Sequence, residues 1–185
     1  MSQKTKWAID PTHTEIGFKV KHMMFTNVSG KIVKYDATIE TGADDFSDAD
    51  IRFSGNADSI TTGNTDRDAH LLSPDFFDAA KFPKIDFHAT SFTRLDEGNY
   101  ELAGDLTMLG ATNQVKLAVE SGGLMKDPWG NIKAAFNITG KINRRDWGLT
   151  WNAALDAGGV LVSDEVRISA EVQLVKQVNE AVQLV

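Results

Sequence analysis

The stretch Val166-Arg167-Ile168-Ser169-Ala170-Glu171-Val172-Gln173-Leu174 alternates an apolar and a polar residue at almost every step. Successive side chains of a β-strand point to opposite faces of the sheet, so this pattern predicts a strand with one face in a core and one face in water. The same period of two recurs along most of the 185 residues. We therefore expect an all-β protein built of antiparallel strands, because antiparallel sheets are the ones that leave one face in water.

Other segments of the chain carry the same pattern, each with an apolar phase and a polar phase. The apolar phases are Ile16, Phe18 and Val20; Val33, Tyr35, Ala37 and Ile39; Phe53, Gly55 and Ala57; Ile85, Phe87 and Ala89; Tyr100, Leu102, Leu106 and Met108; Val115, Leu117 and Val119; and Ile132, Ala134, Phe136, Ile138 and Ile142. Turn residues at 96–99, 109–113 and 127–131 join the later segments. Connections this short favour antiparallel neighbours.

Roughly eight strands of this kind can close into a barrel, which removes exposed sheet edges. The segments run to about ten residues, longer than the usual mode of about 5–6. This length favours a deep, calyx-like, eight-stranded antiparallel barrel over the competing two-sheet sandwich. Small residues in the inward phase are expected to leave a dry apolar cavity. They are Gly55, Ala57, Ala89, Gly104, Ala134 and Gly140.

The segment Thr62–Asp78, called the lid segment below, interrupts the alternation. Asn64 or Thr65 can cap a short helix, and Ser73-Pro74 is typical of an N-cap followed by proline at the first helical position. The segment therefore predicts short helices that cover one side of the barrel. Arg67 and His70 are one helical turn apart and can face the same way.

Composition is typical of one globular domain, with 42% hydrophobic and 24% charged residues. We assign residues 1–176 to the barrel domain and 177–185 to a C-terminal tail, for which a short amphipathic helix and a frayed terminus are both open. A net charge of −7 argues against nucleic-acid binding. The absence of cysteine excludes disulfides and thiol catalysis.

The first residues, Met1–Lys6, lead directly into Trp7-Ala8-Ile9 without an apolar stretch. Neither a signal peptide nor a membrane span is visible. The expected location is therefore the cytoplasm, or the periplasm if the sequence is a trimmed form.

Several short motifs, in a fixed order, resemble the YceI-like, polyisoprenoid-binding family. They are Trp7–His13, Phe18–His22, the lid segment, Phe82-Pro83, Gly104–Gly110 and Arg144–Leu149. The resemblance extends from about Trp7 to Val175. It implies a lipocalin-like barrel, partly closed by a helix, that holds a long isoprenoid chain of the quinone or polyprenyl phosphate type. Members of the family are commonly exported from bacteria, whereas no signal peptide is visible here.

The inward phase, the lid segment and the late segment Arg144–Leu149 together give a set of candidate ligand-binding residues. The set is Phe18, Val20, His22, Tyr35, Phe53, Arg67, His70, Phe76, Phe77, Phe87, Leu106, Met108, Phe136, Ile138, Arg144 and Trp147. Arg67, His70 and Arg144, with Arg145, are candidates for a phosphate or a quinone oxygen. Two structural roles compete: Arg67 can tie the lid to the barrel, and His22 can be a core histidine.

The expected function is non-enzymatic binding, transport or storage of a long-chain isoprenoid lipid, with no other cofactor. One alternative is an enzyme that acts on such a lipid, with Arg67 and His70 polarising the head group, although no nucleophile with its base is evident. The other is a sugar-binding module that uses Trp129, Trp147 and Trp151. The histidines lack metal-ligand spacing. A homodimer stays open, because homodimers are the commonest oligomers.

Overall fold

The computed structural model describes residues 3–42 and 44–178. The elements in chain order are β1 (Thr5–Ile9), η1 (Pro11–His13), β2 (Glu15–His22), β3 (Thr26–Ile32), β4 (Tyr35–Thr41), β5 (Asp50–Asn56), η2 (Ala57–Ser59), β6 (Ile60–Thr61), α1 (Thr65–Leu72), β7 (Lys84–Asp96), β8 (Asn99–Met108), β9 (Ala111–Lys126), β10 (Ile132–Asn143), η3 (Arg144–Trp147) and β11 (Val162–Lys176). The elements labelled η are single 3₁₀ turns.

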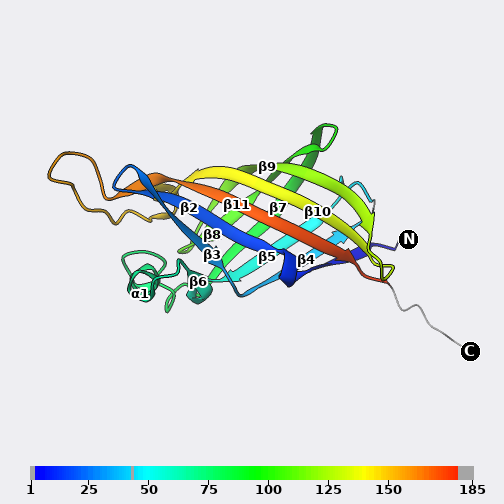
Figure 1. Cartoon of the computed structure of the whole chain (residues 1–185), viewed down its shortest axis with the longest axis horizontal. Helices are drawn as coiled ribbons and strands as arrows, with labels where there is room; N and C mark the ends of the chain where they lie inside the picture. Colours follow the sequence, from blue (N-terminus) through cyan, green and yellow to red (C-terminus); the bar gives the residue numbers. More distant parts are fainter. Residues whose placement is uncertain (1–2, 43, 179–185) are drawn as a thin grey trace, which may run out of the picture.

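The strands form one antiparallel sheet that closes on itself (Figure 1). Its order is β1-β4-β5-β7-β8-β9-β10-β11, and a further pairing of β1 with β11 completes the ring. The predicted all-β, eight-stranded antiparallel barrel is therefore confirmed. The long hairpins β7–β8, β8–β9 and β9–β10 turn at the predicted places.

Three strands of the barrel bend part of the way along, which is why more than eight strands are labelled. β11 pairs with β1 near its C-terminal end and with β2 along the rest of its length. β1 and β2 are thus two halves of one barrel strand, joined by η1. By the same reasoning β3 continues into β4 and β5 continues into β6, because β2 pairs with β3 and β3 pairs with β6.

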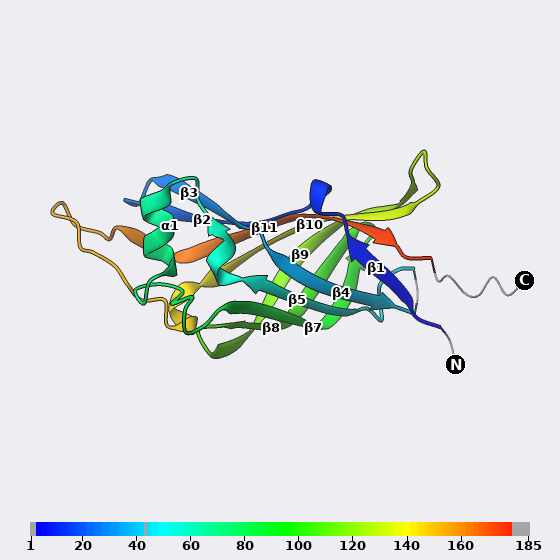
Figure 2. The ribbon, with the colours of Figure 1, turned by 90° about the horizontal axis from the view of Figure 1, so that it is seen from below.

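The barrel is elongated, and its two ends differ (Figures 1 and 2). The end that carries α1, the β2–β3 turn and the loop 149–161 is called the lid end below. The other end lies near the described ends of β1 and β11 and is filled by aromatic side chains. There the ring of Phe46 lies 4.9 Å from Trp7 and 5.2 Å from Phe136. Trp7 donates from Nε1 to Thr41 Oγ1 at 3.0 Å, so its one polar atom is satisfied in the core.

The lid segment contains one helix. Asn64 caps α1 as predicted, because its side-chain oxygen accepts from the Arg67 backbone N–H at 3.0 Å. The prediction of a second helix at Ser73-Pro74 is wrong, because Ser73 ends α1 and turns follow it. The Ser73 hydroxyl donates to the His70 carbonyl oxygen at 2.6 Å, so it serves the last turn of α1 rather than starting a new helix.

Two of the small inward residues, Gly104 and Gly140, do not create the interior space that the sequence predicted for them. A Cβ atom at Gly104 would collide with the ring of Phe87, and one at Gly140 would collide with Leu117. These glycines therefore seat large neighbouring side chains against the barrel wall. The interior space lies farther in, between the apolar side chains of opposite strands.

None of the helices in the described part of the chain is long and apolar enough to cross a membrane.

Candidate ligand-binding cavity

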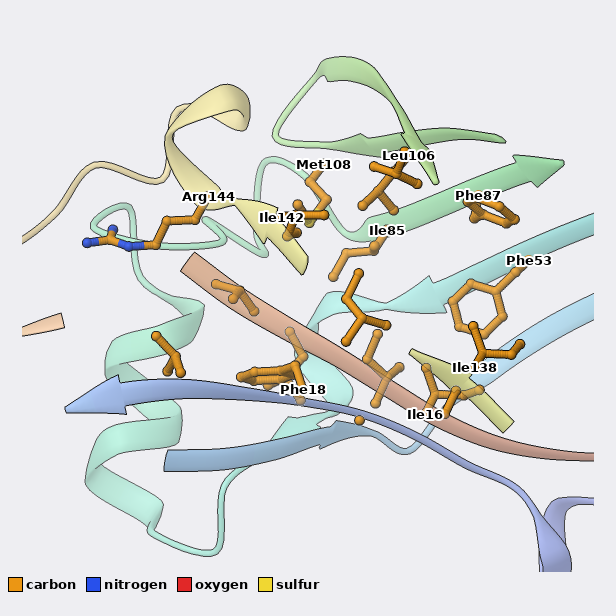
Figure 3. A pocket seen from close by; sticks show the side chains of 18 of the residues that line it. Ile16, Phe18, Phe53, Ile85, Phe87, Leu106, Met108, Ile138, Ile142 and Arg144 are labelled. Carbon is orange, nitrogen blue, oxygen red and sulfur yellow. The ribbon is translucent and has the colours of Figure 1, made fainter. Parts of the chain in front are cut away.

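A cavity of about 620 Å³ runs inside the barrel (Figure 3). This volume falls within the range of about 300–1,000 Å³ that is typical of small-molecule sites. Its wall is made of inward side chains from nearly every strand. Figure 3 shows Ile16, Phe53, Phe87 and Ile138 among them.

The ionisable side chains that line the cavity are confined to the lid end. They come from the end of β2, from α1 and from η3, and they are Lys21, His22, Asp66, Arg67, His70 and Arg144. Along the rest of the described wall the lining side chains are apolar. The cavity is therefore apolar along its length and polar at one end, which suits a ligand with a long hydrocarbon chain and a polar head.

Arg144 is the most deeply buried of these charged residues, with 3% of its surface exposed. Its guanidinium donates to the backbone oxygens of Ser163 at 2.9 Å and Leu149 at 2.6 Å, and at 3.4 Å to that of Val162. Burial lowers its pKa below the ordinary value, although an arginine in a protein stays charged. In Figure 3 it lies on the α1 side of the cavity, apart from the apolar side chains.

α1 is tied to the barrel mainly through two consecutive threonines. Asp68 accepts from the Thr62 backbone N–H at 2.8 Å and hydroxyl at 2.6 Å, and from the Thr61 hydroxyl at 3.1 Å. Burial raises the pKa of Asp68, but these hydrogen bonds outweigh it and hold the pKa below its ordinary value. Arg67 donates to Thr62 Oγ1 at 2.7 Å and to the Thr62 carbonyl at 2.9 Å. The tethering role considered for Arg67 is thus present in the structure.

His70 lies in an aromatic cluster beside the lid. Its ring contacts Trp151 and Phe76 edge-on, at centroid distances of 4.8 and 5.0 Å. Nε2 lies 2.9 Å from Asp75 Oδ2. His70 therefore connects α1 to the loop that follows η3, and all three rings of the cluster line the cavity.

Most of the predicted binding residues line this cavity. Those that do are Phe18, Val20, His22, Phe53, Arg67, His70, Phe76, Phe77, Phe87, Leu106, Met108, Phe136, Ile138 and Arg144. Tyr35 and Trp147 lie outside the lining. Tyr35 packs beside Phe53, at a centroid distance of 5.5 Å. Trp147 is buried in the core and donates to the Leu106 carbonyl at 2.8 Å. That the lining residues bind a ligand stays a prediction.

The sequence-based set of binding residues omitted two kinds of lining residue. Ile16, Ile168 and Ala170 belong to apolar phases that the alternation had already identified, so their signal was present. Trp151 and Leu161 lie in the irregular loop after η3, where no period marks an inward position.

The geometry assembles neither a nucleophile with its base nor a tryptophan platform, although Arg67 and His70, which the enzyme alternative requires, both line the cavity. The Ser73 hydroxyl hydrogen-bonds the backbone of His70 rather than its ring, so Ser73, His70 and Asp75 do not form a nucleophile and base chain. Trp129 and Trp147 flank the twelve-residue strand β10, about 40 Å of extended chain, so they cannot form one sugar platform. Among the described residues no group of three or more His, Asp or Glu could hold a metal ion.

Comparisons with known proteins agree with this architecture. The sequence matches the family model of the YceI-like domain over residues 7–174. A UPF0312 protein of Staphylococcus aureus strain N315 is 35% identical over 170 residues, which cover 91% of this chain and 96% of that protein.

Solved structures show the same fold. The YCEI protein of Campylobacter jejuni is 30% identical, with a TM-score of 0.74 over 91% of this chain and 96% of that one. A domain of Saccharophagus degradans, described as polyisoprenoid-binding and implicated in plant cell wall breakdown, is 10% identical, with a TM-score of 0.68 over 92% of this chain and 98% of that one. At that identity the likeness concerns the fold alone. The family match, which covers nearly the whole described chain, shows that the protein belongs to the YceI-like family.

Proposed function

We propose that this protein binds a long-chain isoprenoid lipid, of the isoprenoid quinone or polyprenyl phosphate type, and carries or stores it without changing it chemically. The observation that carries this proposal is the one-sided polarity of the cavity. Its wall is apolar along the barrel, and its ionisable side chains gather at the lid end. Membership of the YceI-like family supports the proposal, as does a structural relative described as polyisoprenoid-binding.

The apolar wall is sufficient to supply most of the binding energy. Each buried methylene contributes about 0.8 kcal/mol, so a few prenyl units outweigh a single polar contact. We expect the chain to lie along the barrel between Phe53, Phe87 and Ile138, and to end short of the buried Trp7–Phe46 pair.

The head group is proposed to lie at the lid end, near Arg67 and His70. The bonds from Arg67 to Thr62 use two of the five N–H donors of its guanidinium. The remaining donors suit a phosphate or a quinone oxygen. Arg144 is less suited to this role, because its guanidinium already donates to three backbone carbonyls.

A thermal-shift series with isoprenoids of increasing chain length tests the proposal. A ligand at about 100 times its Kd adds about 2.7 kcal/mol to stability, which raises Tm by about 5–10 °C for a chain of this size. We expect the shift to grow with chain length until the cavity is full, and straight-chain alkanols to give smaller shifts.

A matched pair of variants on β11 locates the site. Ala170 is buried and lines the cavity, whereas Ser169 is exposed on the opposite face of the strand. Ala170→Phe should fill part of the cavity and shorten the longest chain that binds, and Ser169→Phe should leave the series unchanged. The proposal would be overturned if isoprenoids raised the Tm of both variants equally. It would also be overturned if no isoprenoid raised the Tm of the parent protein.

A further inference from the structure

The tip of the β2–β3 hairpin exposes a cluster of large apolar side chains at the lid end. Met23, Met24 and Phe25 are 55%, 58% and 85% exposed, and Val160 in the neighbouring loop is 40% exposed. Hairpin and loop are in contact: the Met23 backbone N–H donates to the Leu161 carbonyl at 2.8 Å, and a side chain at Gly159 would collide with Met24. We call these four residues the apolar tip.

The apolar tip adjoins the polar end of the cavity. His22 precedes Met23 and lines the cavity, and Leu161 follows Val160 and lines it as well. In Figures 1 and 2 the β2–β3 turn and the loop 149–161 extend from the barrel at the end that carries α1. A surface that covers the apolar tip would therefore lie beside the place where a ligand enters or leaves.

The backbone conformation of the turn is unfavourable for the residues that occupy it. Met23 and Met24 have φ values of 51° and 64°, and the Phe25 N–H donates to the His22 carbonyl at 3.3 Å. Asn-Gly is the preferred pair in a two-residue turn with both φ angles positive, because bulky side chains are strained there. The two methionines therefore strain the turn, and because they are exposed they do not stabilise a core either.

The charge of the same hairpin differs from that of the whole protein. The net charge is −7, yet residues 16–35 contain four lysines and no aspartate or glutamate. Lys19 and Lys21 are exposed on β2, directly behind the tip, and neither forms an ion pair with a residue in the described ranges. The loop 149–161 adds a single charged residue, Asp156.

We propose that the apolar tip docks the lid end on an anionic phospholipid bilayer. Met23, Met24, Phe25 and Val160 insert among the lipids, while Lys19 and Lys21 face the anionic head groups. Apolar side chains with lysines behind them are the composition by which a peripheral segment binds such an interface. The purpose of this docking, which is to pass an isoprenoid between the bilayer and the cavity, rests on the proposed function. The docking itself does not.

Flotation with phospholipid vesicles tests the docking directly. The parent protein should float with vesicles of phosphatidylcholine and phosphatidylglycerol, and less with phosphatidylcholine alone. Phe25→Ser should weaken this binding by about tenfold or more, because it removes the most exposed of the large apolar side chains at the tip. The matched control is Trp129→Ser, which removes an 83% exposed side chain from the β9–β10 turn, and it should float like the parent.

Two further variants separate docking from folding and from charge. Met23→Asn with Met24→Gly relaxes the turn, so Tm should hold or rise by about 2–4 °C while vesicle binding falls. Lys19→Gln with Lys21→Gln should weaken binding to anionic vesicles roughly tenfold or more and leave binding to neutral ones unchanged.

A parallel titration with farnesol in vesicle-free buffer reports on the cavity alone. Tip variants that bind farnesol normally but do not float support the docking role. Flotation without farnesol binding would overturn the proposed function and leave the docking role standing. The docking proposal is overturned if the parent protein does not float with anionic vesicles, or if the tip variants float as well as the parent.

Discussion

At the scale of single residues, Arg144 shows how one charge can be buried in a largely apolar wall. Its guanidinium donates to carbonyl oxygens on both sides of the loop 149–161, at Leu149 and at Val162 and Ser163. The sequence identified Arg144 as a head-group candidate, but its carbonyl partners come from an irregular loop whose path no periodicity describes. A role in holding this loop could not be separated in the sequence from a role in binding a head group.

The first prediction concerns this loop anchor. Arg144→Lys should lower the free energy of unfolding by about 1–3 kcal/mol, because an ammonium group cannot reach the same spread of carbonyls and leaves buried acceptors unpaired. Urea unfolding measures the change. Arg67→Lys is the control on the exposed lid and should alter stability much less, so equal losses for both variants would contradict the anchoring role.

The second prediction concerns Asp10, which caps the turn between β1 and β2. It accepts from the Thr12 hydroxyl at 2.7 Å and backbone N–H at 3.0 Å, and lies 2.9 Å from His13 Nδ1. These bonds, chiefly those from Thr12, hold the pKa of Asp10 well below its ordinary value. A depressed carboxyl pKa contributes stability that is present above the unfolded-state pKa, near 4, and is lost as the pH falls below it.

Asp10→Asn should therefore be less stable at neutral pH and should lose less stability on acidification than the parent protein. Urea unfolding at pH 7 and at pH 3 measures both quantities. Some loss of stability between pH 7 and pH 3 should remain in Asp10→Asn, because Asp68 and Asp127 also have lowered pKa values. If Asp10→Asn loses as much stability between pH 7 and pH 3 as the parent protein does, Asp10 is not a source of acid sensitivity.

At the scale of elements, α1 is a lid that is held by polar bonds and by the partly buried side chain of Leu71, which packs against the core. None of its residues is classed as fully buried, and Asp68 supplies most of its hydrogen bonds to the barrel. Its start could be predicted, because Asn64 offers a local cap. The second helix could not be excluded from the sequence, because Ser73-Pro74 fits a helix start and the competing bond from Ser73 to the His70 carbonyl depends on α1 ending there.

The third prediction follows from this attachment. Asp68→Ala should release α1 from Thr61 and Thr62, so amide hydrogen exchange should accelerate in residues 62–78 while β8 and β9 keep their protection. Under the proposed function, bound isoprenoid should also dissociate faster. Hydrogen exchange followed by mass spectrometry resolves the two regions. Asp66→Ala, on the same helix, is the control and should change exchange little; loss of protection throughout the barrel would contradict a local role.

At the scale of the whole molecule, the alternation of apolar and polar residues predicted the barrel, because each strand buries one face and exposes the other to water. It did not predict the bends. β3 was missed, since Gly30 leaves only Val28 and Ile32 to mark its inward phase, and β1 was missed because it is short. One residue from which the cavity was predicted leaves no space, because Phe87 lies over Gly104. Side-chain packing between distant strands decides where space remains, and a period of two does not describe that packing.

The tail beyond residue 178 lies outside the described residues, and the cytoplasmic location stays a prediction.

The central claim is that the barrel interior holds an isoprenoid chain. Mass spectrometry of the intact protein purified from its native host, followed by analysis of its organic extract, tests this most directly. We predict one isoprenoid lipid per chain, reduced in amount in Ala170→Phe and unchanged in Ser169→Phe. Protein that carries no isoprenoid under these conditions, or that carries equal amounts in both variants, would contradict the claim.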